Sequence, residues 1–144
     1  MELISSDTQD IEFMRLAIAE ARKAELLDEV PIGAVVVRDG EVIAAAYNRR
    51  ETDADPAGHA EFLAMKQASN KLGVWRLSGC TVYVTLEPCI MCAGLMHQAR
   101  IDRCVFGAFD PKAGALGSLY QVNAVPGQLG LQSAAEWPGG KMLN

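Results

Sequence analysis

The sequence predicts an α/β fold in which helices cover both faces of a mixed sheet. Three observations carry this prediction: a helical pattern near the start, two β-type runs joined by a tight turn, and a later alternation of helix and strand signals. A two-residue turn makes an antiparallel pair, whereas strands connected through helices tend to run parallel. The sheet should therefore combine both kinds of pairing.

The first helix is indicated over residues 7–27, where apolar residues recur at three- and four-residue spacing. These residues are Ile11, Met14, Ile18 and Ala21. Asp7 is expected to cap the helix. The next segment, "PIGAVVVRDGEVIAAAYN", holds two apolar runs around Asp39-Gly40, a dipeptide typical of a tight hairpin. Both runs are almost continuously apolar, so both faces of the hairpin should be covered.

The second half of the chain alternates helices and strands. After a polar loop that contains a proline, a helix is predicted from His59 to Leu72. Residues 81–86 are rich in β-branched side chains and predict a strand. A helix should follow over residues 89–99 and a further strand over 103–109.

Composition fits a single globular domain. The chain has 144 residues, of which 50% are hydrophobic and 22% are charged. We expect one domain over residues 1–123 and a divergent tail of poor order over 124–144, where two prolines interrupt any periodicity. The acidic N-terminus shows no signal-peptide pattern, and no apolar run approaches the roughly 20 residues of a membrane span. A soluble cytoplasmic protein is therefore expected.

The net charge of −5 argues against a general nucleic-acid coat protein, which should be basic. A local basic patch stays open, because cations can gather on one face of an acidic protein. Its candidates are Arg49, Arg50, Arg100, Arg103 and Lys112. Solvated surface positions explain the same residues equally well.

A metal site is indicated by residues that begin two predicted helices. His59 stands at the start of one helix, and Cys89 and Cys92 share the first turn of the next. Helix N-termini converge outside the carboxyl ends of parallel strands, so one imidazole and two thiolates can meet at a tetrahedral zinc. Three protein ligands leave one position open, which is the arrangement of catalytic zinc sites.

In such an open site Glu61 would have a catalytic role, whereas a closed structural zinc site would not need this carboxylate. Zinc makes hydroxide available near neutral pH, and Glu61 can carry the proton of the water to a leaving nitrogen. Attack on an amidine-like ring carbon would release ammonia. The sequence order H-x-E followed by P-C-x-x-C is the signature of zinc-dependent nucleobase deaminases.

Other interpretations of these residues exist. A lone histidine is usually structural, and a C-x-x-C pair also occurs in redox dithiols or by chance. Cys80 and Cys104 lack ligand spacing and are expected in the core. A redox role would leave His59 and Glu61 unexplained, so the zinc interpretation is preferred.

The resemblance extends beyond this signature. The stretches "VPIGAVVV", "YNRRE", "VYVTLEPCIMCAGLM" and "ARIDRCVFGAFDPKAGALGSLY" resemble the bacterial tRNA-specific adenosine deaminases of the cytidine deaminase-like superfamily. The resemblance runs from about residue 10 to about residue 123. It implies a three-layer α/β/α cytidine deaminase-like fold with a central mixed sheet of about five strands. It also implies a homodimer that hydrolyses adenosine to inosine at the wobble position of tRNA anticodons.

The same resemblance implies roles for individual residues. His59, Cys89 and Cys92 would bind one Zn²⁺ per chain, and Glu61 would be the proton shuttle. The residues expected to contact the substrate or to border the RNA groove are Asn48, the backbone N–H of Ala60, Pro88, Asp110 and Lys112. Asn48 could instead be a turn former after the hairpin. The expected partner is the anticodon stem-loop of a tRNA, with no DNA and no membrane.

Two departures from the family pattern bear on the substrate. The family often has "DPTAHAE" where this chain has "DPAGHAE", and the C-terminal amphipathic helix of the family is not recognisable after Asn123. Two alternative functions therefore stay open. One is a deaminase of a free nucleobase, nucleoside or nucleotide of the guanine or cytosine type. The other is a non-catalytic, zinc-stabilised RNA-binding subunit, against which an intact Glu61 argues.

Overall fold

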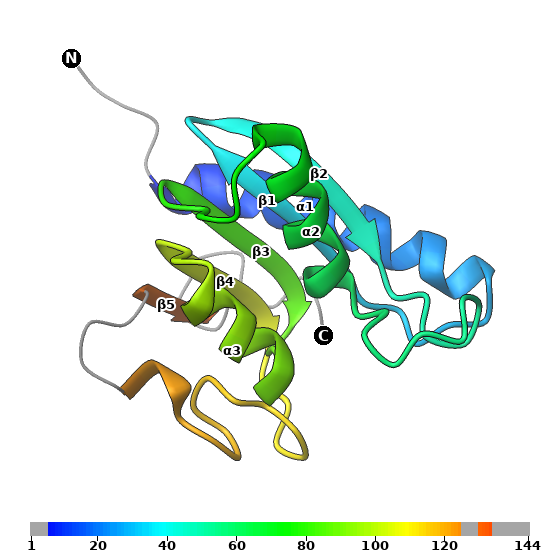
Figure 1. Cartoon of the computed structure of the whole chain (residues 1–144). Helices are drawn as coiled ribbons and strands as arrows, with labels where there is room; N and C mark the ends of the chain where they lie inside the picture. Colours follow the sequence, from blue (N-terminus) through cyan, green and yellow to red (C-terminus); the bar gives the residue numbers. More distant parts are fainter. Residues whose placement is uncertain (1–5, 125–129, 134–144) are drawn as a thin grey trace.

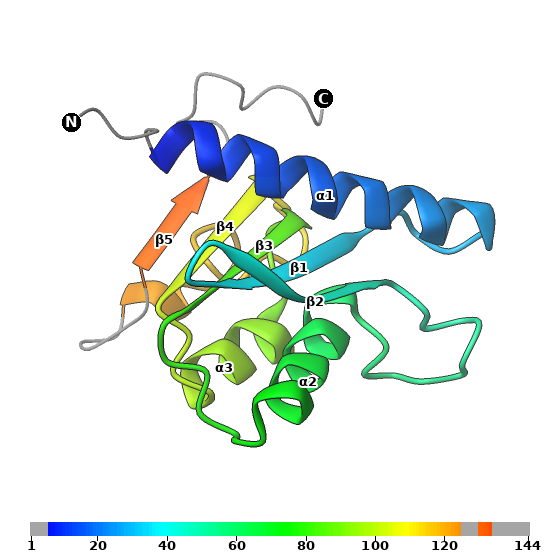
Figure 2. The same cartoon turned by 90° about the horizontal axis from the view of Figure 1, so that it is seen from above.

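A computed structural model describes residues 6–124 and 130–133 of the chain. One sheet lies between helix α1 on one face and helices α2 and α3 on the other (Figure 2), which confirms the predicted layers. In chain order the elements are α1 (Ser6–Leu26), β1 (Gly33–Arg38), β2 (Glu41–Tyr47), α2 (Ala60–Leu72), β3 (Cys80–Leu86), α3 (Ile90–Gln98), β4 (Arg103–Ala108), a 3₁₀ turn (Val122–Ala124) and β5 (Gly130–Ser133).

The sheet is mixed, with strand order β2-β1-β3-β4-β5 (Figure 1). Strand β1 pairs antiparallel with β2 and β3, whereas β3–β4 and β4–β5 are parallel. The predicted hairpin is confirmed: Asp39 and Gly40 both have positive φ, of 52° and 76°, as a two-residue hairpin turn requires. The expected cover on both faces holds for β1, which is buried over Gly33–Val37, while β2 at the end of the sheet is only partly buried.

Helix α1 packs closely on β1. A Cβ atom at Gly33 would lie 2.1 Å from the carbonyl oxygen of Ala17, so only glycine permits this approach. Met14 of α1 packs with Val35 and Tyr83 of the sheet. Asp10 is 1% exposed. Its carboxylate accepts a hydrogen bond of 2.5 Å from the Tyr83 hydroxyl and forms an ion pair with Arg103. A buried carboxylate held by two donors fixes α1 across β3 and β4.

Helices α2 and α3 approach the other face of the sheet through small side chains. Ala60, Ala64 and Ala93 are fully buried there against a cluster that includes Phe106. Small residues bring the helix axes close to the strands. Consequently the first turns of α2 and α3 come together near the carboxyl ends of the parallel strands (Figure 1).

The structure differs from the sequence expectations at the chain ends. Helix α1 begins at Ser6, so Asp7 lies in its first turn and is not its cap. Gly130–Ser133, within the predicted tail, form β5 along β4, a strand that the sequence did not indicate. Four residues are too few to show a readable alternation of apolar and polar side chains, so the sequence pattern does not indicate this strand. The rest of the tail, residues 125–129 and 134–144, lies outside the described residues.

Among the helices that the structure describes, none combines the length and the apolar character that crossing a bilayer requires.

Candidate active site

His59 lies at the end of the loop that follows β2. It occupies the N-cap position of α2 with extended backbone (φ −79°, ψ 144°), and its side chain makes no capping hydrogen bond. The loop before it is held tightly, because a Cβ at Gly58 would lie 3.1 Å from the Arg50 nitrogen. The imidazole therefore lies at the start of the helix but does not cap it.

The two cysteines come from the turn between β3 and α3. Cys89 is the N-cap residue of α3, also without a side-chain capping bond, and Cys92 lies fully buried in the first turn. The Nδ1 atom of His59 is 3.5 Å from Cys89 Sγ and 3.6 Å from Cys92 Sγ. All three ligand atoms lie within 4.8 Å of one another. The predicted meeting of one imidazole with two thiols is therefore confirmed.

These distances fit zinc. A tetrahedral zinc with a Zn–N bond of about 2.05 Å and Zn–S bonds of about 2.3 Å sets nitrogen and sulfur ligands about 3.6 Å apart. The observed separations of 3.5 and 3.6 Å match this geometry. Cys80 and Cys104 are buried in the core and stand outside the ligand group, as predicted. Three protein ligands leave the fourth position of a tetrahedral ion open.

The thiols are electrostatically suited to a metal. Hydrogen bonds from Cys92, the larger cause, and from His59 together lower the pKa of Cys89 to about 3. The same shared proton raises the pKa of Cys92, as does its burial. A zinc ion binds cysteine as thiolate, so metal binding releases the proton that the two sulfurs share.

Glu61 lies in the first turn of α2 and lines the same cavity as His59. Its side chain is 4% exposed, and burial raises its pKa to about 7. A neighbouring dication favours the charged form of a carboxyl group and so opposes this rise. A buried carboxyl that can exchange a proton near neutral pH suits general acid–base chemistry.

The cavity in front of these groups has a volume of about 150 Å³. A cavity of this size accommodates a single aromatic ring. Its lining combines the starts of the two helices with three other segments: Val30 and Ile32 before β1, Asn48 and Arg50 after β2, and Asp110 and Ala113 after β4. A ring held here would lie beside the metal ligands and Glu61.

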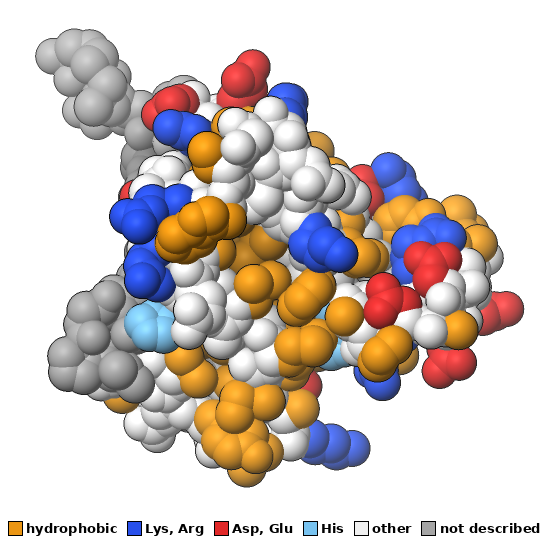
Figure 3. Space-filling model, viewed as in Figure 1, with side chains coloured by type: hydrophobic (Ala, Val, Ile, Leu, Met, Phe, Trp, Pro, Cys, Tyr) orange, Lys and Arg blue, Asp and Glu red, His pale blue; other side chains and the backbone are white. Residues whose placement is uncertain are grey.

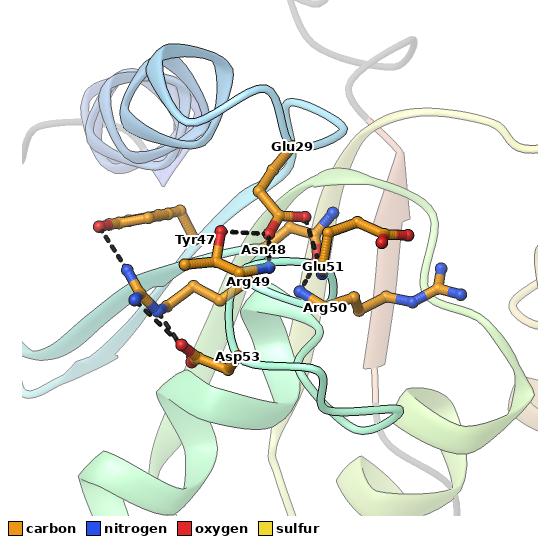
Figure 4. Close-up of polar contacts among 8 residues, drawn as sticks. Glu29, Tyr47, Asn48, Arg49, Arg50, Glu51 and Asp53 are labelled. Atoms are coloured by element: carbon orange, nitrogen blue, oxygen red, sulfur yellow. Dashed lines mark hydrogen bonds and ion pairs between the residues drawn. The ribbon is translucent and has the colours of Figure 1, made fainter.

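Asn48 lines this cavity and also holds its own loop. Its side chain is buried, its Oδ1 accepts a hydrogen bond of 3.0 Å from the Arg50 N–H, and its Nδ2 donates to the Val30 carbonyl at 3.2 Å. Figure 4 shows the carboxamide beside Arg50. Asn48 therefore forms the turn, and the same residue lines the cavity, so the turn-forming role does not exclude the substrate-binding prediction.

The loop after β2 has further anchors (Figure 4). The buried carboxylate of Glu29 accepts hydrogen bonds from Thr52, at 2.6 Å from both its N–H and its hydroxyl. Arg49 pairs with Asp53 at 2.9 Å, which occupies this cation within its own loop. Of the five cations considered for a basic patch, Arg50 lines the cavity.

The remaining predicted substrate residues lie at different depths. Ala60 and Asp110 line the cavity. Pro88 is fully buried behind Cys89, and its carbonyl accepts a hydrogen bond of 2.8 Å from Ala115. Lys112 is exposed on the loop after β4, outside the cavity lining.

Glu87 was not singled out from the sequence, although it lines the cavity and is only 2% exposed. The signal was present: a carboxylate ends an apolar strand and precedes a buried turn, where a charge requires partners. What the sequence did not reveal was where those partners come from.

Comparison with known proteins agrees with this chemistry. The model of the cytidine and deoxycytidylate deaminase zinc-binding region matches residues 7–108. The tRNA-specific adenosine deaminase of Bacillus subtilis (strain 168) is 56% identical over 112 residues, which are 78% of this chain and 70% of that protein.

Two solved structures show the same fold. One, from a study of A-to-I editing by tRNA:A34 deaminases at the wobble position of transfer RNA, has a TM-score of 0.82 and 46% identity, and the match covers 85% of this chain and 91% of that one. The other is guanine deaminase from Bacillus subtilis, with a TM-score of 0.68, 34% identity and coverage of 74% and 69%. The cytidine deaminase-like fold implied by the sequence resemblance is thereby confirmed.

Proposed function

This chain belongs to the cytidine and deoxycytidylate deaminase family, and we propose that it is a zinc-dependent hydrolase that converts adenosine to inosine at the wobble position of tRNA anticodons. The observation that carries the proposal is a three-ligand zinc site beside a cavity that is lined by His59, Cys89 and Glu61 and has space for one base ring. The likeness to tRNA adenosine deaminases supports adenosine in RNA as the substrate.

The chain's own residues supply binding and proton transfer. Zinc, when bound by His59, Cys89 and Cys92, supplies a nucleophile by making water acidic near neutral pH. Glu61 would take a proton from the attacking water and deliver it to the departing amine. A carbon–oxygen bond forms at the ring carbon, the carbon–nitrogen bond breaks, and ammonia leaves. The base must leave its stack to reach the cavity, which an anticodon loop permits more readily than a duplex.

Asn48 and the first turn of α2 bind the base in this proposal. An amide side chain can both donate to and accept from a purine edge. The N–H of Ala60 belongs to the first helical turn, whose N–H groups have no acceptor within the helix. Asp110 and Lys112 border the groove for flanking nucleotides, and Pro88 contributes through shape alone because it is fully buried.

We also propose a homodimer. Figure 3 shows apolar side chains gathered over α3 and the loop that follows β4. The large exposed apolar residues of this region are Ile90, Phe109, Leu119 and Tyr120, each about half exposed. Such a patch marks an interface more often than free surface. Sedimentation equilibrium that returned the mass of one chain would contradict the dimer. The proposed tRNA substrate supports a cytoplasmic location as part of the same proposal.

A substrate panel tests the function. Purified zinc-loaded protein should form inosine in a synthetic anticodon stem-loop with adenosine at the wobble position. It should leave free adenosine, adenine, guanine and cytosine unchanged. A matched stem-loop with its adenosine moved out of the wobble position serves as control. Turnover of a free base alone would replace RNA editing by the runner-up, a nucleobase deaminase. Zinc binding without turnover of any substrate would indicate a non-catalytic subunit.

Replacing Asn48 with alanine should raise KM for the stem-loop by at least about tenfold, because a buried partner of the base is lost. Since Asn48 also holds Arg50, the control is Thr52→Val, which removes a hydrogen bond from the same loop without touching the cavity. Its KM should stay within about twofold of the wild type. Equal effects of the two substitutions in steady-state kinetics would show that Asn48 supports the loop and not the base.

A further inference from the structure

Glu87 places a carboxylate in a nearly closed position between β3 and the turn that carries the metal ligands. It lies two residues before Cys89 and is 2% exposed. Burying a carboxylate is costly unless hydrogen bonds replace its lost water. The hydrogen-bond donors around Glu87 therefore indicate the role of this buried carboxylate.

Four donor groups form hydrogen bonds to the Glu87 carboxylate, and all four belong to one loop, residues 110–118. Oε1 accepts a hydrogen bond of 3.0 Å from the N–H of Asp110 and one from the Ser118 hydroxyl. Oε2 accepts hydrogen bonds of 2.9 Å from the N–H of Leu116 and 3.0 Å from the N–H of Ser118. A carboxylate offers about four acceptor positions. Glu87 therefore uses its full capacity on this loop and has none left for a substrate.

The loop is shaped around this carboxylate. A Cβ atom at Gly114 would lie 2.2 Å from the Glu87 carboxyl carbon, so a glycine is needed where the loop crosses it. A further hydrogen bond, from the Ala115 N–H to the Pro88 carbonyl at 2.8 Å, joins the loop to the same turn. The wall that results carries Asp110 and Ala113, which line the cavity.

We propose that Glu87 is a positioning residue that sets substrate affinity by fixing the 110–118 loop as one wall of the cavity. It acts through Asp110 and Ala113 and touches no reacting atom. This role rests on the proposed function, because the wall matters for catalysis only if the cavity receives the base. It assigns a use to the acidic residue that precedes the Pro-Cys pair.

Substitution of Glu87 by glutamine is the sharp test. A carboxamide keeps the size of the side chain but turns one oxygen into an N–H₂ donor. In one orientation of the carboxamide this donor faces the N–H of Asp110. In the other orientation it faces the N–H groups of Leu116 and Ser118. One side of the loop therefore loses its acceptor, while His59, Cys89, Cys92 and Glu61 are unchanged.

The expected result is a rise in KM of at least about tenfold, as for the loss of one hydrogen bond to a charged group. Both kcat and zinc content should stay close to wild type. The control is Asp102→Asn, which removes the same charge from a carboxylate that accepts the Gly79 N–H at the far end of β3. It should leave KM unchanged. A loss of kcat at constant KM, or an equal rise of KM in both variants, would overturn the proposal.

Hydrogen exchange separates this proposal from the proposed function, because it requires no turnover. In E87Q the amide of Asp110, or the amides of Leu116 and Ser118, should lose protection, while those of β3 and β4 keep theirs. If the wild type turned over another substrate of the panel, KM for that substrate would be the readout. Unchanged exchange in the loop would refute the positioning role, whichever substrate proved correct.

A milder variant guards against misfolding. Ser118→Ala removes the hydroxyl bond to Oε1 without leaving a buried N–H unpaired. It should fold normally and raise KM by a smaller factor, about two- to fivefold. A KM equal to that of the wild type, together with unaltered loop exchange, would contradict the proposal.

Discussion

Replacing Glu61 with alanine should abolish deamination while the protein keeps one zinc per chain. Positioned acid–base groups typically contribute about 10²- to 10⁴-fold to a rate, and Glu61 is assigned both proton transfers. The zinc should stay, because the ligand atoms belong to His59, Cys89 and Cys92. The fold should also hold, because the substitution removes a carboxyl group that burial already disfavours in its charged form.

The measurement is kcat on the stem-loop together with zinc content by atomic emission. Glu61→Gln keeps the shape of the side chain but cannot accept the proton, so it should be as inactive as the alanine variant. Gln67→Ala, at an exposed position of the same helix, should be fully active. Retention of more than about a tenth of the wild-type rate in both Glu61 variants would remove this residue from the mechanism.

The metal site could be predicted from the sequence because its information is local. His59 precedes a helix, Cys89 and Cys92 are three residues apart in a helical turn, and the hairpin turn is a dipeptide. Each pattern depends on neighbours along the chain. Only one non-local step was needed, namely that helix N-termini meet at the carboxyl ends of parallel strands.

The supports of the site could not be predicted, because their partners are far apart in sequence. Glu87 bonds to residues 23 to 31 positions later, and Glu29 to residues 22 to 23 positions later. Asp10 accepts a hydrogen bond from Tyr83, which lies 73 residues later in the sequence. A buried carboxylate can be suspected from its apolar surroundings, but nothing in the local pattern names its donors. Loop shape therefore emerged only with the tertiary structure.

The same reasoning explains β5. Its residues, Gly130–Ser133, pair in parallel with β4 over Arg103–Phe106. Backbone pairing is available to almost any sequence, so a short strand leaves little trace in composition. Strand β4, by contrast, is buried over most of its length and shows an apolar run that was recognisable.

Cys92 and Cys104 offer a matched pair for testing the metal site, since both are 0% exposed thiols in the same domain. Cys92→Ala should weaken zinc binding by about three orders of magnitude, because one of three protein ligands is lost from a site whose binding energy is shared among them. Activity should fall with the metal. The melting temperature should fall as well, since the ion binds the folded chain preferentially.

Cys104→Ala should behave differently. It removes a core sulfur at a cost of about 1–2 kcal/mol of unfolding free energy, yet it should keep one zinc and the wild-type kcat. Zinc titration with a competing chelator distinguishes the two variants. If Cys104→Ala lost the metal as readily as Cys92→Ala, the ligand set would extend beyond the three residues whose atoms gather at the site. The fourth position would then be closed, and the open coordination that hydrolysis needs would be lost with it.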